Sequence, residues 1–425
     1  MEKTFRVKPE KILTDVSIAG TRFKTLQLFA DTVYLLTSPI AREDGEQLII
    51  EPGTVIKSNP GIGISINQGA TITANGTIDR PIVFTSNLPP GEANNYWQGI
   101  TINGKSINNN GNPNGIADDV SGSLQYIRIE FGGLRLNSVG SGTVLNHIQT
   151  SYSNYSAGFE FNGGTVDGKY LVSIACGTFS DFYFGNGYTG RLQYLLGYRF
   201  PFFGSATGRV TNAISGVYIE NNNANPSAQP STNPLMSNVT MIGPAPMNGT
   251  AAAYKDSSNR FYSAALVINH NAGFKIRNTA LLGYPVGAWQ IADSLSARKV
   301  HYLESEFTHS MVHCIDTLRS FYIRRGVYRI YDYIDFRSYM LEPRFNNVMA
   351  YSTRGFGFQD EGTFNETAAL PHETSVLLKD GNFLGSDFGH PFFDKVEFRG
   401  AFGKENWLRG WTNFSPLKSR YNLPE

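Results

Sequence analysis

Short apolar segments separated by glycine and asparagine recur along the chain, and their pattern favours strands over helices. The segment Ile50-Glu-Pro-Gly-Thr-Val-Ile56 returns as Ile66-Asn-Gln-Gly-Ala-Thr-Ile72. Each copy is typical of a strand, a glycine turn and a second strand, because β-branched residues suit strands and glycine accepts the positive φ of tight turns. The repeat predicts short strands that stack on one another at regular intervals.

Longer repeats follow from about residue 122. Alternating apolar segments begin at Leu124, Val144, Tyr170 and Leu192, at intervals of roughly 20 to 26 residues, which lie within the periods of solenoid repeats. Aromatic strands separate them, so one coil holds two or three strands. We therefore predict an all-β fold, a right-handed parallel β-helix in which each coil packs on the next, with capping segments at both ends.

The repeats also predict the domain boundaries. Residues 41–416 are expected to form the β-helix, after an N-terminal cap or lead segment at 1–40 and before a tail at 417–425. The aromatic-rich segment 390–416 is the expected C-terminal cap, because an open terminal coil would recruit another chain. The segment 319–337, rich in Tyr, Arg and Asp, fits either a coil or a docking surface. Loop insertions are expected near 88–96, 107–120 and 221–260.

Composition excludes some classes of partner. The 425 residues carry 36 basic and 35 acidic side chains, so no broad positive field exists for nucleic acid or an anionic membrane. Neither an apolar targeting segment at the start nor a run of 18 apolar residues is present. The two cysteines, Cys176 and Cys314, stand in apolar surroundings, which predicts buried thiols rather than a disulfide or a metal site.

One motif suggests nucleotide chemistry. Residues 99–106 match the phosphate-binding pattern G-x-x-x-x-G-K-[ST], but that site needs a loop followed by a helix whose N-terminus faces the phosphates. In this chain the central residues alternate as in a strand, and the Asn-rich residues that follow do not favour a helix. We predict a strand that ends in a turn.

The sequence shows no clear arrangement of residues for metal binding or for hydrolysis. His372 and Glu373 have no second histidine at zinc spacing, and a structural role is expected for His309 and His313, although they are four residues apart. A glycosidase needs two carboxylates across the sugar. The adjacent carboxylates Asp118 and Asp119 fit a solvated turn. Three glutamates could line one face of the fold, but nothing in the sequence brings two of them together: Glu130, Glu160 and Glu220. No lyase-like cluster of Asp, Lys and Arg is evident, so we predict no catalytic residue, metal ligand or cofactor.

Aromatic residues in or beside predicted turns favour binding over catalysis. Their rings could stack against a sugar or a peptide, whereas packing between coils is the alternative for each one. The candidate ligand-binding residues are Tyr96, Trp97, Tyr152, Tyr155, Phe179, Tyr183 and Tyr188.

Several segments resemble a family of Bacteroidetes cell-surface β-helix lipoproteins, in the same order along most of the chain. They include Leu48-Ile-Ile-Glu-Pro-Gly-Thr-Val-Ile-Lys57, Gly76-Thr-Ile-Asp-Arg-Pro-Ile-Val-Phe-Thr-Ser86, Trp97-Gln-Gly-Ile-Thr-Ile-Asn-Gly104, Tyr126-Ile-Arg-Ile-Glu-Phe-Gly-Gly133, Ser151-Tyr-Ser-Asn154, Phe159-Glu-Phe-Asn-Gly-Gly-Thr-Val166, Arg399-Gly-Ala-Phe-Gly403 and Trp411-Thr-Asn-Phe414.

This resemblance implies an outer-membrane, cell-surface location through a lipid anchor that would attach upstream of residue 1. It also implies a partner, a TonB-dependent transporter with its SusD-like lipoprotein, together a SusCD-like importer. Members commonly carry an Asp-rich run after the cysteine-bearing strand, but residues 177–184 hold one Asp. If that run binds calcium in relatives, the site is expected to be lost in this chain, because hard cations need several oxygen ligands.

Three functions remain. The leading hypothesis is a non-enzymatic surface lipoprotein that binds a nutrient, a glycan or peptide, or that serves the importer as an accessory component. A carbohydrate-active β-helix enzyme, either a lyase or a glycosidase, would need carboxylates that converge in one groove. A scaffold or assembly subunit of an outer-membrane complex would co-purify with a barrel protein.

Overall fold

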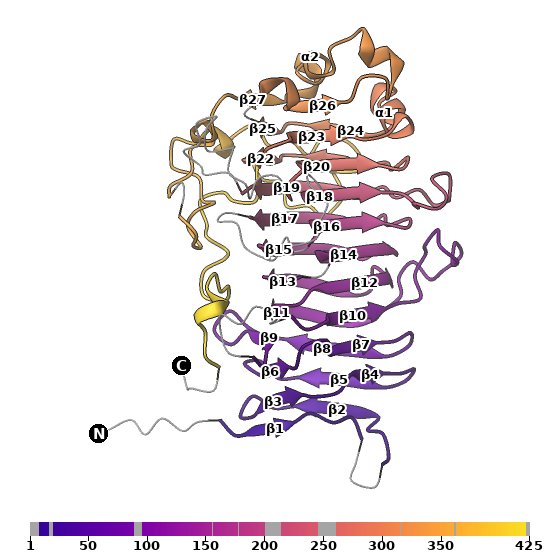
Figure 1. Cartoon of the computed structure of the whole chain (residues 1–425), viewed down its shortest axis with the longest axis vertical. Helices are drawn as coiled ribbons and strands as arrows, with labels where there is room; N and C mark the ends of the chain where they lie inside the picture. Colours follow the sequence, from indigo (N-terminus) through magenta and orange to yellow (C-terminus); the bar gives the residue numbers. More distant parts are fainter. Residues whose placement is uncertain are drawn as a thin grey trace.

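The computed structural model describes residues 8–16, 20–88, 96–154, 156–176, 178–199, 214–244, 261–314, 316–360 and 363–421. Within these residues the chain is a right-handed parallel β-helix, as predicted: two long sheets run beside each other, and each coil adds strands to both (Figure 1). Every pairing between named strands is parallel, because each turn of the solenoid places a strand on the equivalent strand of the turn before it.

One sheet has ten strands, one from each coil. Their inward positions are in register, so Ile100, Leu134, Phe159 and Phe182 form a single interior row. Phe159 and Phe182 stack with ring centroids 5.1 Å apart. The strands are β4 (Ile40–Arg42), β7 (Gly63–Ile66), β10 (Gly99–Asn103), β12 (Leu134–Val139), β14 (Ala157–Gly164), β16 (Ser180–Gly185), β18 (Ser215–Glu220), β20 (Ala264–Asn269), β23 (Gly287–Ile291) and β26 (Phe321–Ile323).

The other sheet has seventeen strands. Its short strands at either end occur in pairs, and the longer middle strands combine both members of a pair: β11 contacts β8 through residues 122–125 and β9 through 127–129. The strands are β1 (Glu10–Ile12), β2 (Thr25–Leu28), β3 (Val33–Leu36), β5 (Gln47–Ile50), β6 (Val55–Ser58), β8 (Thr71–Asn75), β9 (Ile82–Ser86), β11 (Gly122–Glu130), β13 (Val144–Ser151), β15 (Gly168–Ile174), β17 (Arg191–Tyr198), β19 (Leu235–Ile242), β21 (Lys275–Arg277), β22 (Ala280–Leu282), β24 (Glu306–Thr308), β25 (Met311–His313) and β27 (Val348–Ala350).

A single left-handed residue bends each long strand at the junction of its two halves. Tyr126, His147, Tyr170 and Tyr194 have φ between 49° and 62°, a conformation that is uncommon for non-glycine residues. Their rings stack along the solenoid, with centroids 4.4, 4.3 and 4.7 Å apart in succession. Contacts between the rings of successive coils therefore compensate for the backbone strain at this corner.

The segment that follows β26 covers the open end of the last coil. It contains η4 (Arg329–Asp332), α2 (Phe336–Met340) and η5 (Pro343–Phe345), while η3 (Thr317–Arg319) precedes the strand. Phe336 packs on the buried Trp289 with centroids 5.5 Å apart, and Tyr331 packs on Phe336 at 4.7 Å. Most of the segment 319–337 is therefore an end cap. The helix α1 (Ser294–His301), capped by Asp293, lies in the loop between β23 and β24.

The expected C-terminal cap has a different position. Beyond β27, the chain passes through η6 (Thr353–Phe356), η7 (Val376–Leu378) and η8 (Pro416–Lys418), and residues 380–421 run down the outside of the solenoid (Figure 1). We call residues 380–421 the C-terminal strap. The prediction that 390–416 caps the terminal coil is wrong, because these aromatics pack against the corner of the middle coils: Trp411 contacts His147 at 5.5 Å and Trp407 contacts Tyr170 at 5.3 Å.

Side-chain amides hold the strap at several coils. Gln149 donates to the Asn413 carbonyl (2.6 Å) and accepts from its N–H (2.8 Å). Gln193 binds Asp394 in the same reciprocal way (2.9 and 2.8 Å), and Asn278 binds Asn382 (3.1 and 2.8 Å). Each amide thus satisfies both polar groups of one strap residue, as a neighbouring strand would.

The strand boundaries correct the predicted ones. Three ladder strands, β1 to β3, lie within the expected lead segment 1–40, and the last ladder strand ends at Ala350 rather than near 416. The strand β19 lies inside the expected insertion 221–260, because Met236, Val239 and Met241 continue the buried interior rows. Residues 104–121 do connect β10 to β11 as a loop.

Two smaller predictions are confirmed. Gly99 to Asn103 form a strand, not a phosphate-binding loop. Cys176 and Cys314 are buried free thiols. In the described part of the chain, no helix is long and apolar enough to span a bilayer.

Candidate functional site

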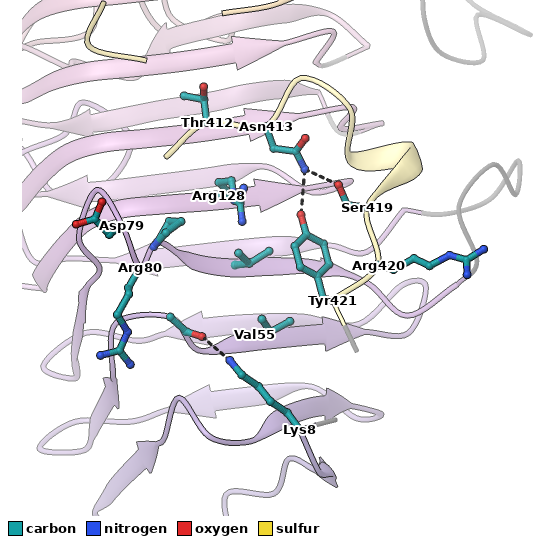
Figure 2. A pocket seen from close by; sticks show the side chains of 13 residues that line it. Lys8, Val55, Asp79, Arg80, Arg128, Thr412, Asn413, Ser419, Arg420 and Tyr421 are labelled. Carbon is teal, nitrogen blue, oxygen red and sulfur yellow. Dashed lines mark hydrogen bonds between the residues drawn. The ribbon is translucent and has the colours of Figure 1, made fainter. Parts of the chain in front are cut away.

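A cavity of about 540 Å³ lies between the outer face of the seventeen-stranded sheet and the end of the C-terminal strap (Figure 2). This volume falls within the range of small-molecule sites. Strands β6, β9 and β11 form its floor, the loop before β9 forms one wall, and the strap forms another. Its lining residues are Lys8, Gly53, Val55, Asp79, Arg80, Pro81, Val83, Arg128, Thr412, Asn413, Ser419, Arg420 and Tyr421.

The floor combines apolar and basic side chains because of strand register. Val33, Val55 and Val83 lie on consecutive strands, and Arg128 on β11 is the next member of this outward row. The Tyr421 ring packs against the three valines and closes one side of the floor. This outward row therefore changes from aliphatic side chains on β3, β6 and β9 to a cationic side chain on β11.

Cationic side chains dominate the lining. The Arg128 guanidinium lies 5.7 Å from the centre of the Tyr421 ring, and its Nε is buried without a hydrogen-bond partner among the described residues. Lys8 Nζ donates to the Gly53 carbonyl at 3.4 Å. Arg80 lies beside the same glycine: a Cβ added there would be 3.1 Å from the Arg80 Nε. Asp79 contributes the one lining carboxylate.

Arg420 lines the cavity but differs from the other cations. Figure 2 shows its side chain pointing away from Arg128 and Lys8, and the residue is exposed. The less exposed cations of the lining are therefore Lys8 and Arg128, whereas Arg80 is exposed like Arg420.

A buried carboxylate holds the strap wall in place. Glu130, two residues after Arg128, is fully buried and accepts hydrogen bonds from the Tyr421 hydroxyl and from Asn413 Nδ2 (3.0 Å). Burial raises the pKa of Glu130, and the nearby Arg128 charge opposes that shift. Burial together with the Glu130 charge also raises the pKa of Tyr421 well above its usual range.

This arrangement favours binding of an anion over acid–base catalysis. An arginine stays protonated at any physiological pH, and the raised pKa of Tyr421 keeps its phenol neutral. The Arg128 side chain is partly exposed, so its guanidinium can donate to an anionic ligand. Carboxylate, sulfate and phosphate groups all match guanidinium geometry.

The structure buries several of the predicted ligand-binding aromatics. Trp97, Tyr152 and Tyr188 are at most 6% exposed. Trp97 Nε1 donates to the Glu130 carbonyl at 2.8 Å, and the Tyr188 hydroxyl donates to the Val166 carbonyl at 2.7 Å. The binding prediction is wrong for these three, because their rings fill the interior or the space beneath the strap, where no ligand reaches them.

The other predicted aromatics have different positions. Tyr96 is partly exposed at the edge of the core, and Tyr155 lies outside the described residues. Phe179 and Tyr183 are partly exposed on the ten-stranded sheet, with ring centroids 6.4 Å apart. The cavity contains none of the seven candidates, since its lining comes from other residues.

The three glutamates that could line one face, Glu130, Glu160 and Glu220, lie on two different sheets. Glu160 and Glu220 flank Tyr183 on the outer face of the ten-stranded sheet: Glu160 pairs with Tyr183 in register, and the Tyr183 hydroxyl donates to Glu220 Oε1 at 2.7 Å. Glu130 belongs to the other sheet and lies beneath the strap.

The residues considered for metal binding or acid–base chemistry are buried or have protein partners. Asp181, the one Asp in segment 177–184, forms a buried ion pair with Arg199 at 2.8 Å, so a guanidinium occupies the position beside it that a cation would need. His313 is buried, which lowers its pKa to about 4. Asp119 accepts from the Ser121 hydroxyl at 3.2 Å. Over the described ranges, no group of three potential ligands could hold a metal ion.

Sequence reasoning missed the residues of the cavity. Lys8, Asp79, Arg80 and Arg128 form the cluster of Asp, Lys and Arg that the sequence did not reveal, because they come from three separate coils and the strap closes the site around them. One signal was present in the sequence: Arg128 is the one basic residue of its strand and lies at an outward position between Ile127 and Ile129.

A family model described as "Pectate-lyase like beta helix domain" matches residues 20–316. The match covers the coils from β2 to β25 and therefore includes the floor of the cavity but not the strap. The chain matches no curated protein and no solved structure.

Proposed function

We propose, from the premise that this chain belongs to the pectate-lyase-like β-helix domain family, that it captures an anionic saccharide in the cavity between β11 and the C-terminal strap. The Arg128 guanidinium carries the proposal. It lines the cavity from the floor strand β11 and is partly exposed. A uronate carboxylate or a sulfate ester would accept from this group, while Lys8 and Arg80 add charge at the edge.

The floor supports a saccharide rather than a free inorganic anion. The partly exposed Tyr421 ring provides an apolar surface beside the cations, and a sugar ring combines apolar C–H faces with polar substituents. A volume of about 540 Å³ also exceeds what one small ion needs.

The second candidate is an enzyme that cleaves the same class of ligand. Asp79, Arg80, Lys8 and Arg128 favour it, since they gather an acid and three cations at one site. We favour binding because Glu130, the buried carboxylate two residues after Arg128, is covered by Tyr421 and Asn413.

The proposal extends to the cellular setting. The segments that resemble Bacteroidetes surface lipoproteins support an outer-membrane location through an upstream lipid anchor. They also support a role beside a TonB-dependent, SusCD-like importer, as a nutrient-binding accessory or a scaffold subunit. Co-purification of the membrane-anchored protein with a transporter pair would support this setting, and recovery of the protein alone would count against it.

Calorimetric titration with oligogalacturonate, and with cellohexaose as a neutral comparison, tests the binding function. We expect the acidic oligosaccharide to bind and Arg128→Gln to weaken binding by about ten-fold or more, because a charge-assisted hydrogen bond contributes about 1.5–3 kcal/mol. Arg420→Gln is the matched control: it removes the same charge from a side chain that points away, so affinity should fall less than about three-fold.

The same samples separate binding from cleavage. Binding without new reducing or unsaturated chain ends supports the proposal. Cleavage that Asp79→Asn abolishes would assign the enzyme instead. An Arg128→Gln variant that binds the acidic oligosaccharide as tightly as the wild type would refute anion recognition in the cavity.

A further inference from the structure

A pair of tyrosines on the outer face of the ten-stranded sheet forms a flat surface. Tyr183 on β16 and Tyr218 on β18 are direct partners in the parallel register. Their ring planes differ by 10° and their centroids lie 6.3 Å apart. The Phe179 ring, tilted by 53° with its centroid 4.4 Å from that of Tyr218, packs against this pair. All three are partly exposed; we call them the tyrosine platform.

Gly185 lets the Tyr183 ring lie across its own strand. A Cβ at position 185 would be 2.5 Å from the Tyr183 Oη and 2.9 Å from its Cζ. Any other residue would therefore push the phenol away from the sheet. Because the ring lies flat instead of projecting, it presents a face to solvent.

Hydrogen bonds fix the orientation of the platform. The Tyr183 hydroxyl donates to Glu220 Oε1 at 2.7 Å, and His270 Nδ1 lies 2.6 Å from Glu220 Oε2. Asn269 Nδ2 donates to the Tyr218 hydroxyl oxygen at 2.9 Å, which leaves the Tyr218 O–H able to donate outward. The rings are therefore ordered before any ligand arrives, which lowers the entropic cost of binding.

Two carboxylates border the platform. Glu160, beside Tyr183 on the neighbouring strand, pairs with Arg135 at 2.6 Å, and Glu220 Oε2 lies 2.6 Å from His270 Nδ1. Glu160 is buried, whereas Glu220 is partly exposed, so the Glu220 carboxylate can accept hydrogen bonds from hydroxyl groups. The carboxylates would disfavour an anionic ligand, in contrast to the cations of the cavity.

We propose that the tyrosine platform is a second binding site, which takes a neutral saccharide. Sugar rings would stack on Tyr183 and Tyr218, and their hydroxyl groups would bind Glu220 and the Tyr218 hydroxyl. Flat aromatic faces bordered by a few fixed polar groups suit a ligand that has apolar C–H faces and many hydroxyls. An acidic peptide suits the site less well, because the carboxylates would repel it.

This site is independent of the cavity. The platform belongs to the ten-stranded sheet, whereas the cavity lies on the seventeen-stranded sheet beneath the strap. Failure of either proposal therefore leaves the other standing.

Titration of the full chain with cellohexaose, maltohexaose, mannohexaose and xylohexaose tests the site. We expect at least one of these neutral oligosaccharides to bind, and Tyr183→Ala and Tyr218→Ala each to weaken that binding by about ten-fold. Tyr322→Ala is the matched control: Tyr322 is partly exposed on β26 of the same sheet, where its ring lies under Arg319 rather than on the platform. Its loss should leave affinity unchanged.

Two further variants separate a role of the ring from a role in folding. Tyr183→Phe keeps the ring and removes its hydrogen bond to Glu220, so we expect a loss of about three-fold or less. Gly185→Ala keeps the tyrosine but displaces its ring, and we expect a loss close to that of Tyr183→Ala. Thermal unfolding of each variant shows whether the fold is retained.

Opposite outcomes would overturn the inference. One is that no neutral oligosaccharide binds at millimolar concentration. Another is that binding survives both alanine substitutions in folded protein. A third is that the platform binds peptides alone. Arg128→Gln should leave neutral-sugar binding intact; if it abolishes that binding, the ligand occupies the cavity and the platform is not the site.

Discussion

Removal of the Trp411 side chain should release the strap wall of the cavity. Trp411 is fully buried between the strap and the solenoid corner. Its ring meets Tyr126 edge-on at 6.0 Å and His147 at 5.5 Å, and its Nε1 donates to the Trp407 carbonyl at 2.7 Å. The substitution Trp411→Ala deletes all of these contacts at the coils next to the cavity.

The cost follows from the buried area. A tryptophan buries about 150–250 Å², which at about 25 cal/mol per Å² corresponds to about 4–6 kcal/mol. Large-to-small substitutions of buried tryptophan cost about 3–5 kcal/mol. The strap is attached at several coils by separate amide pairs, so this loss acts first on its last part, residues 404–421, rather than on the whole solenoid.

Hydrogen-exchange mass spectrometry of residues 404–421 measures the effect directly. We expect exchange in this segment to become at least about a hundred-fold faster, as a loss of about 3 kcal/mol implies, while exchange in β13 to β17 stays slow. Affinity for an acidic oligosaccharide should fall at the same time, because Tyr421 and Asn413 leave the wall. Leu384→Ala, at a strap residue that is 77% exposed, is the control and should change neither.

Unchanged exchange at 404–421 would refute this reasoning, because it would show that Trp411 contributes little to strap attachment. Fast exchange with unchanged ligand affinity would show instead that the strap is not a functional wall of the cavity.

Three further predictions concern stability. Arg199→Met should lower the free energy of unfolding by about 3–5 kcal/mol in a denaturant titration, because it leaves the buried Asp181 carboxylate without its cation; a loss below about 1 kcal/mol would contradict this. Burial raises the pKa of Glu130 in the folded protein, so ionisation of Glu130 opposes folding. The stability of the wild type relative to Glu130→Gln should therefore fall as the pH rises from about 4.5 through that raised pKa. A stability difference that stays constant between about pH 4.5 and 8 would exclude this effect. Gly99→Ala should destabilise the fold by about 2 kcal/mol or more, since Gly99 has a φ of +75° and an added Cβ would lie 2.0 Å from the Gly133 carbonyl oxygen. A melting temperature equal to that of the wild type would disprove this clash.

The local pattern of the sequence determined the fold class. Alternation in segments such as residues 124–131 distinguishes inward from outward side chains, and glycine repeats such as the one around Gly53 mark the turns. Both signals act within a few residues, so they can be read without knowledge of distant contacts. The buried state of Cys176 and Cys314 followed from their apolar neighbours in the same way.

Only the tertiary structure decided which residues meet. Arg128 and Tyr421 are almost 300 positions apart, yet they form one site because the strap returns along the solenoid. Trp97 and Tyr188 were predicted at the surface from nearby turns, but the coil geometry turns both rings into the core. A strand pattern fixes the face on which a side chain lies, whereas burial depends on what later segments cover, and a solenoid places no local constraint on the path of its final residues.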